Sequence, residues 1–424
     1  MATPRWRPKA LPTAQVDTIT VANTWAAADT ATVTINGRSL VLTVGATVTT
    51  AAVATAIKEM INGDAITGDA TRSETGDNVP EFDEVTATVS GSVVTVTGDT
   101  KGRPFTMTAT ENTAGSGTAT QATATAATGP NHWNNALNWD TGSQPADGDT
   151  VYIDNSDVSI LYGLDQSAIE PAATYIAMSF TGNIGLPEVN AEGGYAEYRS
   201  QYLSLGPLIL QVGIGPGRGS GRIKINSTTD PCALTVIDTG SSADDLPAFL
   251  WKGTDSGNAL VMRSGSAGVA VLGAETATFA TFKVDGGSLR LRAGVTLSGA
   301  LVVNDGAVQV NSLIDGSLTM TSGQVTIDGT GNVDQLTVRG GTCVYKTTGT
   351  LGGATVVSGN GVLDFEQDPS AKTVTNPIDI YGQACRVLDG DKVVGTLIVD
   401  CNEGADPSQV RLGSNVRITR GTPA

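Results

Sequence analysis

The sequence predicts a mainly β protein: a small N-terminal α+β domain, then a β-rich region, then a β-solenoid (β-helix). Two observations carry this prediction. A short strand motif recurs five times between residues 282 and 365 at nearly constant spacing. Apolar residues at helical spacing are confined to one segment near 50–62, and the chain is otherwise rich in Thr, Val, Ala and Gly, which are typical of strands and turns.

The recurring motif is an apolar-x-apolar pair, a corner residue, and a second apolar-x-apolar pair. Alternation within each pair indicates a strand with one buried face, and the corner is a residue type that adopts positive φ at low cost. Because a coil repeated at nearly constant length is typical of a β-solenoid, we expect one over residues 251–424. The first pairs end at Val284, Val303, Met320, Val338 and Val357, which lie 17 to 19 residues apart, and the corners are Gly287, Gly306, Gly323, Gly341 and Asn360.

Residues 1–13 form an arm ahead of the first domain. Three prolines exclude regular secondary structure along it, and its charged side chains are all basic. On an acidic chain, this composition predicts docking onto an acidic partner surface. The alternative is a strand-like tail packed on its own chain. The docking candidates are Arg5, Trp6, Arg7 and Lys9.

Residues 14–110 predict a small α+β attachment domain. Asn36-Gly37 lies between two alternating segments and is a strong hairpin signal, because both residues accept positive φ. A helix follows, capped by Thr49 or Thr50 and ending at Asn62-Gly63. Three further strands, near 84–90, 93–97 and 105–110, complete a helix packed over an antiparallel sheet.

The middle of the chain has weaker periodicity. Residues 111–130 are mostly Ala, Thr and Gly and predict a linker or an extended strap. Residues 131–250 predict an irregular β-rich domain of short strands interrupted by Gly and Pro, which opens the same stack as the solenoid.

Composition and charge exclude several classes of function. The chain has 424 residues and a net charge of −17, so nucleic acid is not an expected partner. No apolar run is long enough to cross a membrane, and the N-terminus lacks the apolar segment of a secretory signal. The four cysteines form no C-x-x-C pair, and we expect a buried free thiol at Cys343 and assembly in a reducing cytoplasm. Only 16% of residues are charged, which fits either a surface covered in an oligomer or an exposed Thr-rich face.

Few residues predict chemistry, and we expect neither a catalytic site nor a cofactor. The single histidine, His132, sits in a predicted turn and is expected to make a structural hydrogen bond. The Gly-rich segment from 213 to 221 is expected to be a β-turn, because a strand-like segment follows it and a phosphate loop must open a helix. Corner-flanking carboxylates at Asp285, Asp305, Asp328 and Asp364 fit turns better than a catalytic pair. Metal is not expected, although Asp147, Asp149 and Asp154 are a candidate set for structural Ca²⁺.

Several segments resemble an uncharacterised group of virion structural proteins of tailed bacteriophages. The resemblance covers roughly residues 1–260. It rests on the segment from Ala14 to Val21, the Thr32–Gly37 hairpin, the short Pro104-Phe105-Thr106 segment, the Trp133-to-Trp139 block, and the stretch from Gly193 to Arg199. It implies a structural role in the particle, and it carries over no catalytic residue.

From this resemblance we expect a non-enzymatic structural protein of the virion, assembled in the host cytoplasm. The expected form is a homotrimeric capsid decoration protein of the cement or head-fibre type, which binds the phage major capsid protein or another virion component. Capsid decoration is favoured because the chain ends on the last predicted strands, with no receptor-binding domain after them. The alternative is a tail spike or fibre with host-receptor binding or polysaccharide depolymerase activity, and a further rival is a cell-surface adhesin.

Overall fold

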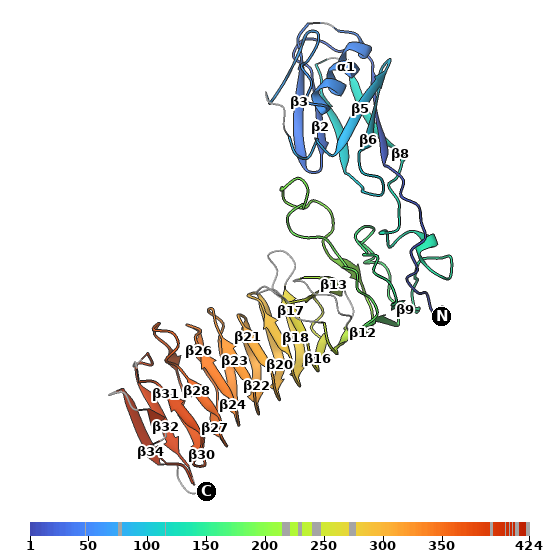
Figure 1. The fold of residues 1–424 in the computed structure, drawn as a ribbon. Coiled ribbons are helices and arrows are strands. Elements are labelled where there is room, and N and C mark those ends of the chain that lie inside the picture. The colour runs from blue at the N-terminus through green and yellow to red at the C-terminus, as the bar shows by residue number, and fades with distance from the viewer. Residues whose placement is uncertain are drawn as a thin grey trace.

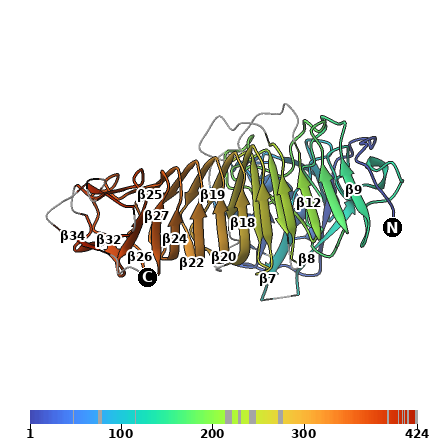
Figure 2. The ribbon, with the colours of Figure 1, turned by 90° about the horizontal axis from the view of Figure 1, so that it is seen from below.

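The structure, a computed structural model, consists of a small β-sheet domain joined to a long parallel β-solenoid (Figure 1). It describes residues 1–46, 48–74, 79–114, 116–213, 221–227, 231–239, 247–270, 277–390, 393–402, 404–406, 408, 410–411 and 415–420. The domain stands off the axis of the solenoid, at the end where the stack begins. Figure 2, a view from below, shows successive strands side by side along one axis.

The N-terminal domain contains two antiparallel sheets of four strands each and the one α-helix of the described ranges. The predicted single sheet under the helix is wrong, because β1, β4 and β8 were not among the predicted strands. The strand orders are β5-β6-β1-β8 and β4-β3-β2-β7, and the helix packs against strands of both sheets. The elements are β1 (Val16–Ala22), β2 (Thr30–Ile35), β3 (Arg38–Val44), α1 (Thr50–Ile61), β4 (Ala70–Arg72), β5 (Val85–Ser90), β6 (Val93–Gly98), β7 (Met107–Asn112) and β8 (Thr118–Thr125).

Local sequence signals explain the turns and caps of this domain. Asn36 and Gly37 adopt φ of 52° and 83°, and β2 and β3 pair directly across them, as predicted. Thr49 is the N-cap of α1, because its side chain accepts a hydrogen bond from the Ala52 amide. Val53, Ile57 and neighbouring apolar residues bury one face of the helix against the sheets.

Residues 111–130, predicted as a linker or an extended strap, contain the edge strand β8. β8 pairs along its full length with β1 and lies at the edge of its sheet. Ala119 is its only buried apolar side chain, and most of its other residues are exposed. An edge strand with so little buried surface carries no alternating apolar pattern, so composition alone suggested a linker.

The solenoid strands alternate between two parallel sheets, one of 15 strands and one of 11 in the described residues. The first sheet contains β9 (Thr150–Ile153), β10 (Ala173–Ile176), β12 (Ile209–Val212), β14 (Ala233–Val236), β16 (Ala259–Met262), β18 (Ala277–Val284), β20 (Val295–Val303), β22 (Leu313–Met320), β24 (Val333–Val338), β26 (Thr350–Leu351), β27 (Thr355–Ser358), β29 (Thr373–Val374), β30 (Ile378–Tyr381), β32 (Leu397–Cys401) and β34 (Val416–Arg420). The second contains β11 (Leu203–Leu205), β13 (Ile223–Ser227), β15 (Phe249–Gly253), β17 (Ser266–Ala270), β19 (Ser288–Leu291), β21 (Ala307–Val310), β23 (Gln324–Ile327), β25 (Thr342–Tyr345), β28 (Val362–Asp364), β31 (Arg386–Leu388) and β33 (Val410–Arg411).

The positions singled out from the sequence repeat stack directly on one another. Val284, Val303, Met320, Val338 and Val357 are register partners from strand to strand. The same column continues back to Ile153 and on to Cys401, and all its members are buried. The predicted β-solenoid is therefore present, held together by an internal column of apolar side chains.

The stack begins well before the predicted boundary at residue 251. β9 is its first strand, and the described strands from β9 to β15 already belong to the same two sheets, as expected for a region that opens the stack. The column positions in this part are Ile153, Ile176, Val212, Val236 and Met262, which lie 23 to 36 residues apart. These long and unequal insertions hid the repeat from a search for constant spacing.

The corner glycines confirm most of the turn prediction. Gly287, Gly306, Gly323 and Gly341 all have positive φ, between 75° and 98°. Asn360 is the exception, because the left-handed residue in that rung is Gly359, with a φ of 61°. Glycine adopts this conformation at lower cost than Asn, so the turn forms one residue earlier. The expected buried thiol is also confirmed: Cys343 is fully buried, and it is free.

The corner glycines also stack so closely that a side chain would not fit. A Cβ atom on Gly306 would overlap the carbonyl oxygen of Gly287, the corner of the preceding rung. We predict that Gly306→Ala lowers the free energy of unfolding by about 2 kcal/mol or more, through the φ of 98° and this overlap. Denaturant unfolding measures the change.

The matched control is Gly352→Ala in the same solenoid. A Cβ atom there has no neighbour within 4 Å, and Gly352 is not among the residues with positive φ. This variant should stay within about 0.5 kcal/mol of the wild type. Equal effects of the two substitutions would contradict close stacking at the corners.

Candidate functional site

The N-terminal arm pairs with the first strand of the solenoid. The amides of Thr150 and Tyr152 donate to the carbonyls of Ala2 (3.1 Å) and Pro4 (2.9 Å), and the Trp6 amide donates to Tyr152 (2.9 Å). The arm therefore runs parallel to β9 and covers its otherwise unpaired edge. An uncovered edge would expose a row of free backbone groups and would invite pairing with other chains.

Three tryptophans close the end of the apolar column beneath the arm. Trp6 contacts Trp139 edge to face, with ring centroids 5.3 Å apart, and Trp133 contacts Trp139 at 4.7 Å. All three are buried and belong to the same core cluster as the solenoid strands. A repeat stack needs such a cap, because its terminal rung has no neighbour on one side.

The basic side chains of the arm are used within the chain. Arg5 and Arg7 both pair with Asp154, with Arg7 Nη2 at 2.7 Å, and the Arg5 guanidinium lies over the Tyr152 ring. The Lys9 amide donates to the side-chain oxygen of Asn138, the last residue of the short 3-10 helix η1 (Ala136–Asn138). These contacts match the alternative of a tail packed on its own chain. Trp6 is fully buried and cannot reach a partner, while docking through the exposed parts of Arg5, Arg7 and Lys9 stays a prediction.

The candidate calcium carboxylates each have a partner in the chain. Asp147 accepts a hydrogen bond from the Glu170 amide, and Asp149 accepts from the amides of Ala2 and Ala146. Asp154 binds the two arginines of the arm. Among the described residues, no group of three or more His, Cys, Asp or Glu side chains is placed to hold a metal ion.

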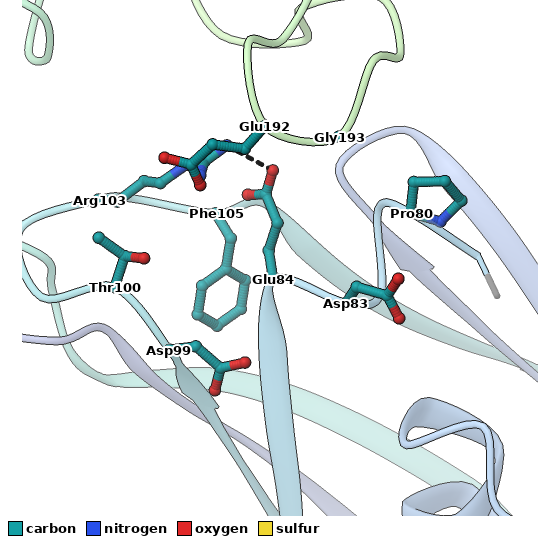
Figure 3. Close-up of a pocket in the computed structure, with 9 residues that line it drawn as sticks. All are labelled: Pro80, Asp83, Glu84, Asp99, Thr100, Arg103, Phe105, Glu192 and Gly193. Atoms are coloured by element: carbon teal, nitrogen blue, oxygen red, sulfur yellow. Dashed lines mark hydrogen bonds and ion pairs between the residues drawn. The ribbon is translucent and has the colours of Figure 1, made fainter. Parts of the chain in front are cut away.

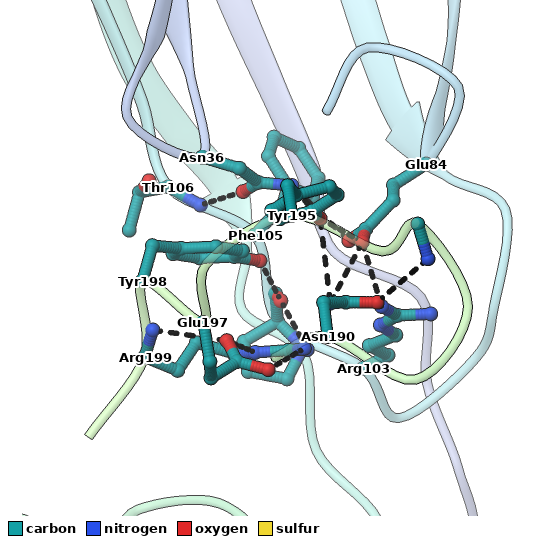
Figure 4. A network of polar contacts seen from close by, with 12 residues as sticks. Asn36, Glu84, Arg103, Phe105, Thr106, Asn190, Tyr195, Glu197, Tyr198 and Arg199 are labelled. Atoms are coloured by element: carbon teal, nitrogen blue, oxygen red, sulfur yellow. Dashed lines mark hydrogen bonds and ion pairs between the residues drawn. The ribbon is translucent and has the colours of Figure 1, made fainter. Parts of the chain in front are cut away.

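A loop of the solenoid holds the N-terminal domain. Residues 187–202, between β10 and β11, reach up to it, and Arg103 of that domain is the centre of the contact (Figure 4). Arg103 Nη2 donates to Glu84 Oε1 at 2.6 Å and to Asn190 Oδ1 at 3.1 Å, and its Nη1 pairs with Glu192. The Tyr195 hydroxyl donates to the same Glu84 carboxylate. We call the group Glu84, Arg103, Asn190, Glu192 and Tyr195 the clasp.

Burial and charge shape the ionisation of this loop. Burial raises the pKa of Tyr195, and its hydrogen bond to Glu84 raises it further, so the phenol stays protonated as a donor. Burial alone would raise the pKa of Glu197, but Arg199 binds it through two nitrogens at 2.8 Å and holds that pKa below its usual value. Arg199 also lies over the rings of Tyr162 and Tyr198.

His132 joins the end cap to the N-terminal domain. Its Nε2 lies 2.8 Å from the Gly102 carbonyl, which confirms the expected structural hydrogen bond. The ring is buried beside Tyr162, and burial lowers the pKa of His132 below its usual value of 6.5. The imidazole is therefore neutral at pH 7 and donates from Nε2.

Two pockets flank the junction. One, of about 300 Å³, lies beside the clasp and is lined by Pro80, Asp83, Glu84, Asp99, Thr100, Arg103, Phe105, Glu192 and Gly193 (Figure 3). In it, Arg103 engages Glu84 and Glu192, so these carboxylates already serve the domain contact. The other, of about 450 Å³, lies between the end cap and Tyr198 and Arg199, whose ring and guanidinium pack on one another.

The remaining candidates from the sequence have local roles. Asp285 binds Lys283 and Asn304, Asp328 accepts from the Gly329 amide, and Asp364 accepts from the Glu366 amide. Asp305 is exposed at its corner. Strand β13 follows the Gly-rich segment, so that segment does not open a helix, and residues 214–220 of it lie outside the described residues.

Comparison of the chain with protein-family models, with curated proteins and with solved structures finds no match. Within the described ranges, no helix is both long and apolar enough to span a bilayer. The assignment of the fold as a β-solenoid therefore depends on the observed strand pairing, and a proposal of function depends on the geometry of the stack and of its contact with the N-terminal domain.

The clasp was missed from the sequence because its members are single residues far apart in the chain. Two of the segments that carry the bacteriophage resemblance do meet there: the Tyr198 hydroxyl donates to the Pro104 carbonyl at 3.0 Å. Nothing in their spacing indicates this contact. A Gly-Gly-Tyr sequence at 193–195 inside a β-rich region is the one local sign of a projecting loop.

We predict that Arg103→Met weakens the domain contact. Arg103 is 9% exposed, and removing it leaves the Glu84 carboxylate buried without its cation, which costs about 3 kcal/mol. The loop over 187–202 should then be cleaved faster in limited proteolysis, and small-angle X-ray scattering should detect a broader range of domain orientations.

Glu192→Gln is the matched control for the clasp. The Glu192 side chain is 69% exposed, so its pairing with Arg103 should contribute less than about 1 kcal/mol. Wild-type proteolysis and scattering are expected. An Arg103→Met variant as resistant to protease as Glu192→Gln would contradict the role given to the clasp.

We predict that the histidine resonance titrates below pH 6.5. The chain has one histidine, so its NMR signal needs no assignment. Because burial depresses the folded pKa, the unfolded state binds a proton first, and stability falls as pH drops below about 6.5. His132→Asn should lose this part of the pH dependence, and a midpoint at or above 6.5 would count against a buried neutral imidazole.

Proposed function

We propose that this chain is a non-enzymatic structural protein of a tailed-phage virion, and that it acts as a homotrimeric capsid decoration protein. The N-terminal domain attaches it to the particle, through the major capsid protein or another virion component. The solenoid projects from that domain or braces neighbouring subunits. A β-solenoid is compatible with fibre-type and spike-type structural proteins.

One observation supports this proposal most strongly: a single apolar column runs from Ile153 to Cys401 through consecutive strands of one parallel sheet. Each rung is held by the rung before it, so the column resists bending as one body. The clasp then fixes the direction in which that body leaves the N-terminal domain. Stiffness and fixed direction suit a protein that serves as building material.

The second candidate is a tail spike or fibre that binds a host receptor or cleaves a polysaccharide. The pocket of about 300 Å³ with four carboxylates favours it, since glycosidases use paired carboxylic acids. Against it, Glu84 and Glu192 are engaged by Arg103. A depolymerase would need two carboxylates free to face a sugar.

Imaging of particles labelled with antibody against this chain tests the proposal, together with light scattering of the purified protein. We expect label over the capsid shell and a mass three times that of the chain. Label on the tail alone would favour the spike, and absence from purified particles would overturn the virion role. A monomeric mass would contradict the trimer.

A further inference from the structure

Two lysines of the second solenoid sheet lie against one tyrosine ring, and an arginine follows further along the same sheet. Lys224 and Lys252 lie on neighbouring strands, β13 and β15, and alternate with the inward-facing Ile225 and Trp251. Both ammonium groups lie over the ring of Tyr202, with Lys252 Nζ 3.9 Å and Lys224 Nζ 5.7 Å from its centroid. Arg292, just after β19 and two strands beyond Lys252 in the same sheet, is the third member; Lys224 is buried, and Lys252 and Arg292 are half-buried. We call Lys224, Lys252 and Arg292 the cation cluster.

The cluster has little compensation from its own chain. Lys224 Nζ donates to the Leu186 carbonyl at 2.6 Å, which is a neutral acceptor. In the described part of the chain, neither Lys252 nor Arg292 forms an ion pair with a carboxylate, and Glu188 is the acidic group whose field reaches the two lysines. Among the described residues, three positively charged side chains therefore lie near one acidic side chain, Glu188.

Electrostatics makes this arrangement unfavourable in the isolated chain. Burial lowers the pKa of Lys252, and Arg292 lowers it further; burial likewise lowers the pKa of Lys224, with Lys252 and Arg292 adding to the effect against Glu188. Like charges held together in a partly desolvated site repel one another, and an anionic group placed between them would reverse that repulsion.

We infer that Lys252 and Arg292 of the cation cluster, with the buried Lys224 adding to their positive charge, form an interaction surface for carboxylates of a second copy of this chain, packed side by side with the first. This rests on the proposed oligomeric function. The chain carries 42 Asp and Glu against 25 Lys and Arg, so a second copy brings many carboxylates to any face it covers. Charge complementarity then favours contact between these carboxylates and the cation cluster.

The geometry favours a protein partner over an acidic polysaccharide. Sugars are commonly bound on open aromatic faces, but Tyr202 is 8% exposed and its ring already receives both ammonium groups. Lys224 and Lys252 lie on neighbouring strands, about 4.8 Å apart, and Arg292 lies two strands beyond Lys252 along the stack axis. A neighbouring solenoid has side chains at that same spacing, so several of its carboxylates can meet the cluster in register.

Sedimentation analysis of charge-reversed variants tests this inference at low and high salt, about 0.05 M and about 0.5 M. In Lys252→Glu and in Arg292→Glu, we expect the association constant to fall about tenfold or more at low salt. High salt should weaken the wild-type oligomer similarly. Lys252→Arg keeps the charge and should keep the assembly. Lys346→Glu, further along the same sheet just after β25, is the matched control and should also assemble.

Circular dichroism melts confirm that each variant is folded, and if Lys252→Glu does not fold, Arg292→Glu decides the question. An oligomer that tolerates both reversals overturns this inference while the virion proposal stands. A wild-type chain that is monomeric throughout overturns it too, together with the trimer. Binding of polygalacturonate by the wild type, lost in Lys252→Glu without any change in assembly, would assign the cluster to a polysaccharide and also overturn it.

Discussion

Each rung of the solenoid depends on the rung before it, because its apolar side chains are buried only when a neighbour covers them. A single coil of four- to nine-residue strands has too little surface to form a core. Stacked in register, every inward Val, Leu, Ile or Met gains about 1.5–3 kcal/mol from burial. Parallel pairing at constant register then places like residues over like, and corner over corner.

Because of this dependence, the sequence departs from the repeat at the first rung, which has no preceding rung, and where the stack contacts the N-terminal domain. At the start, the apolar column meets three tryptophans, and the edge of β9 meets the arm. The basic arm residues neutralise Asp154 there. On the side, an insertion of the stack leaves the rung pattern and carries the polar groups of the clasp to the N-terminal domain. The repeated rungs form the solenoid, and the insertion between them fixes its orientation relative to the N-terminal domain.

The sequence predicted the parts governed by short-range rules. The Asn36-Gly37 hairpin, helix α1, the corner glycines and the stacked positions from Val284 to Val357 all follow from turn chemistry or strict period. It predicted that residues 131–250 open the stack, but it did not identify β9 as the first strand, because insertions vary the rung length. Nor could it pair Arg103 with Glu84 and Glu192, or Arg5 with Asp154. Such contacts join residues that are far apart in the sequence and become neighbours only in the folded chain. The identity of a single charged residue does not indicate which residue it pairs with.

A density map of the purified protein that resolves neighbouring strands, about 4.8 Å apart, tests the stacking most directly. The expected map shows Val284, Val303, Met320, Val338 and Val357 one above another in a single parallel sheet. Antiparallel neighbours in that region, or strands stacked out of chain order, would contradict the column from which the rest of the molecule is built.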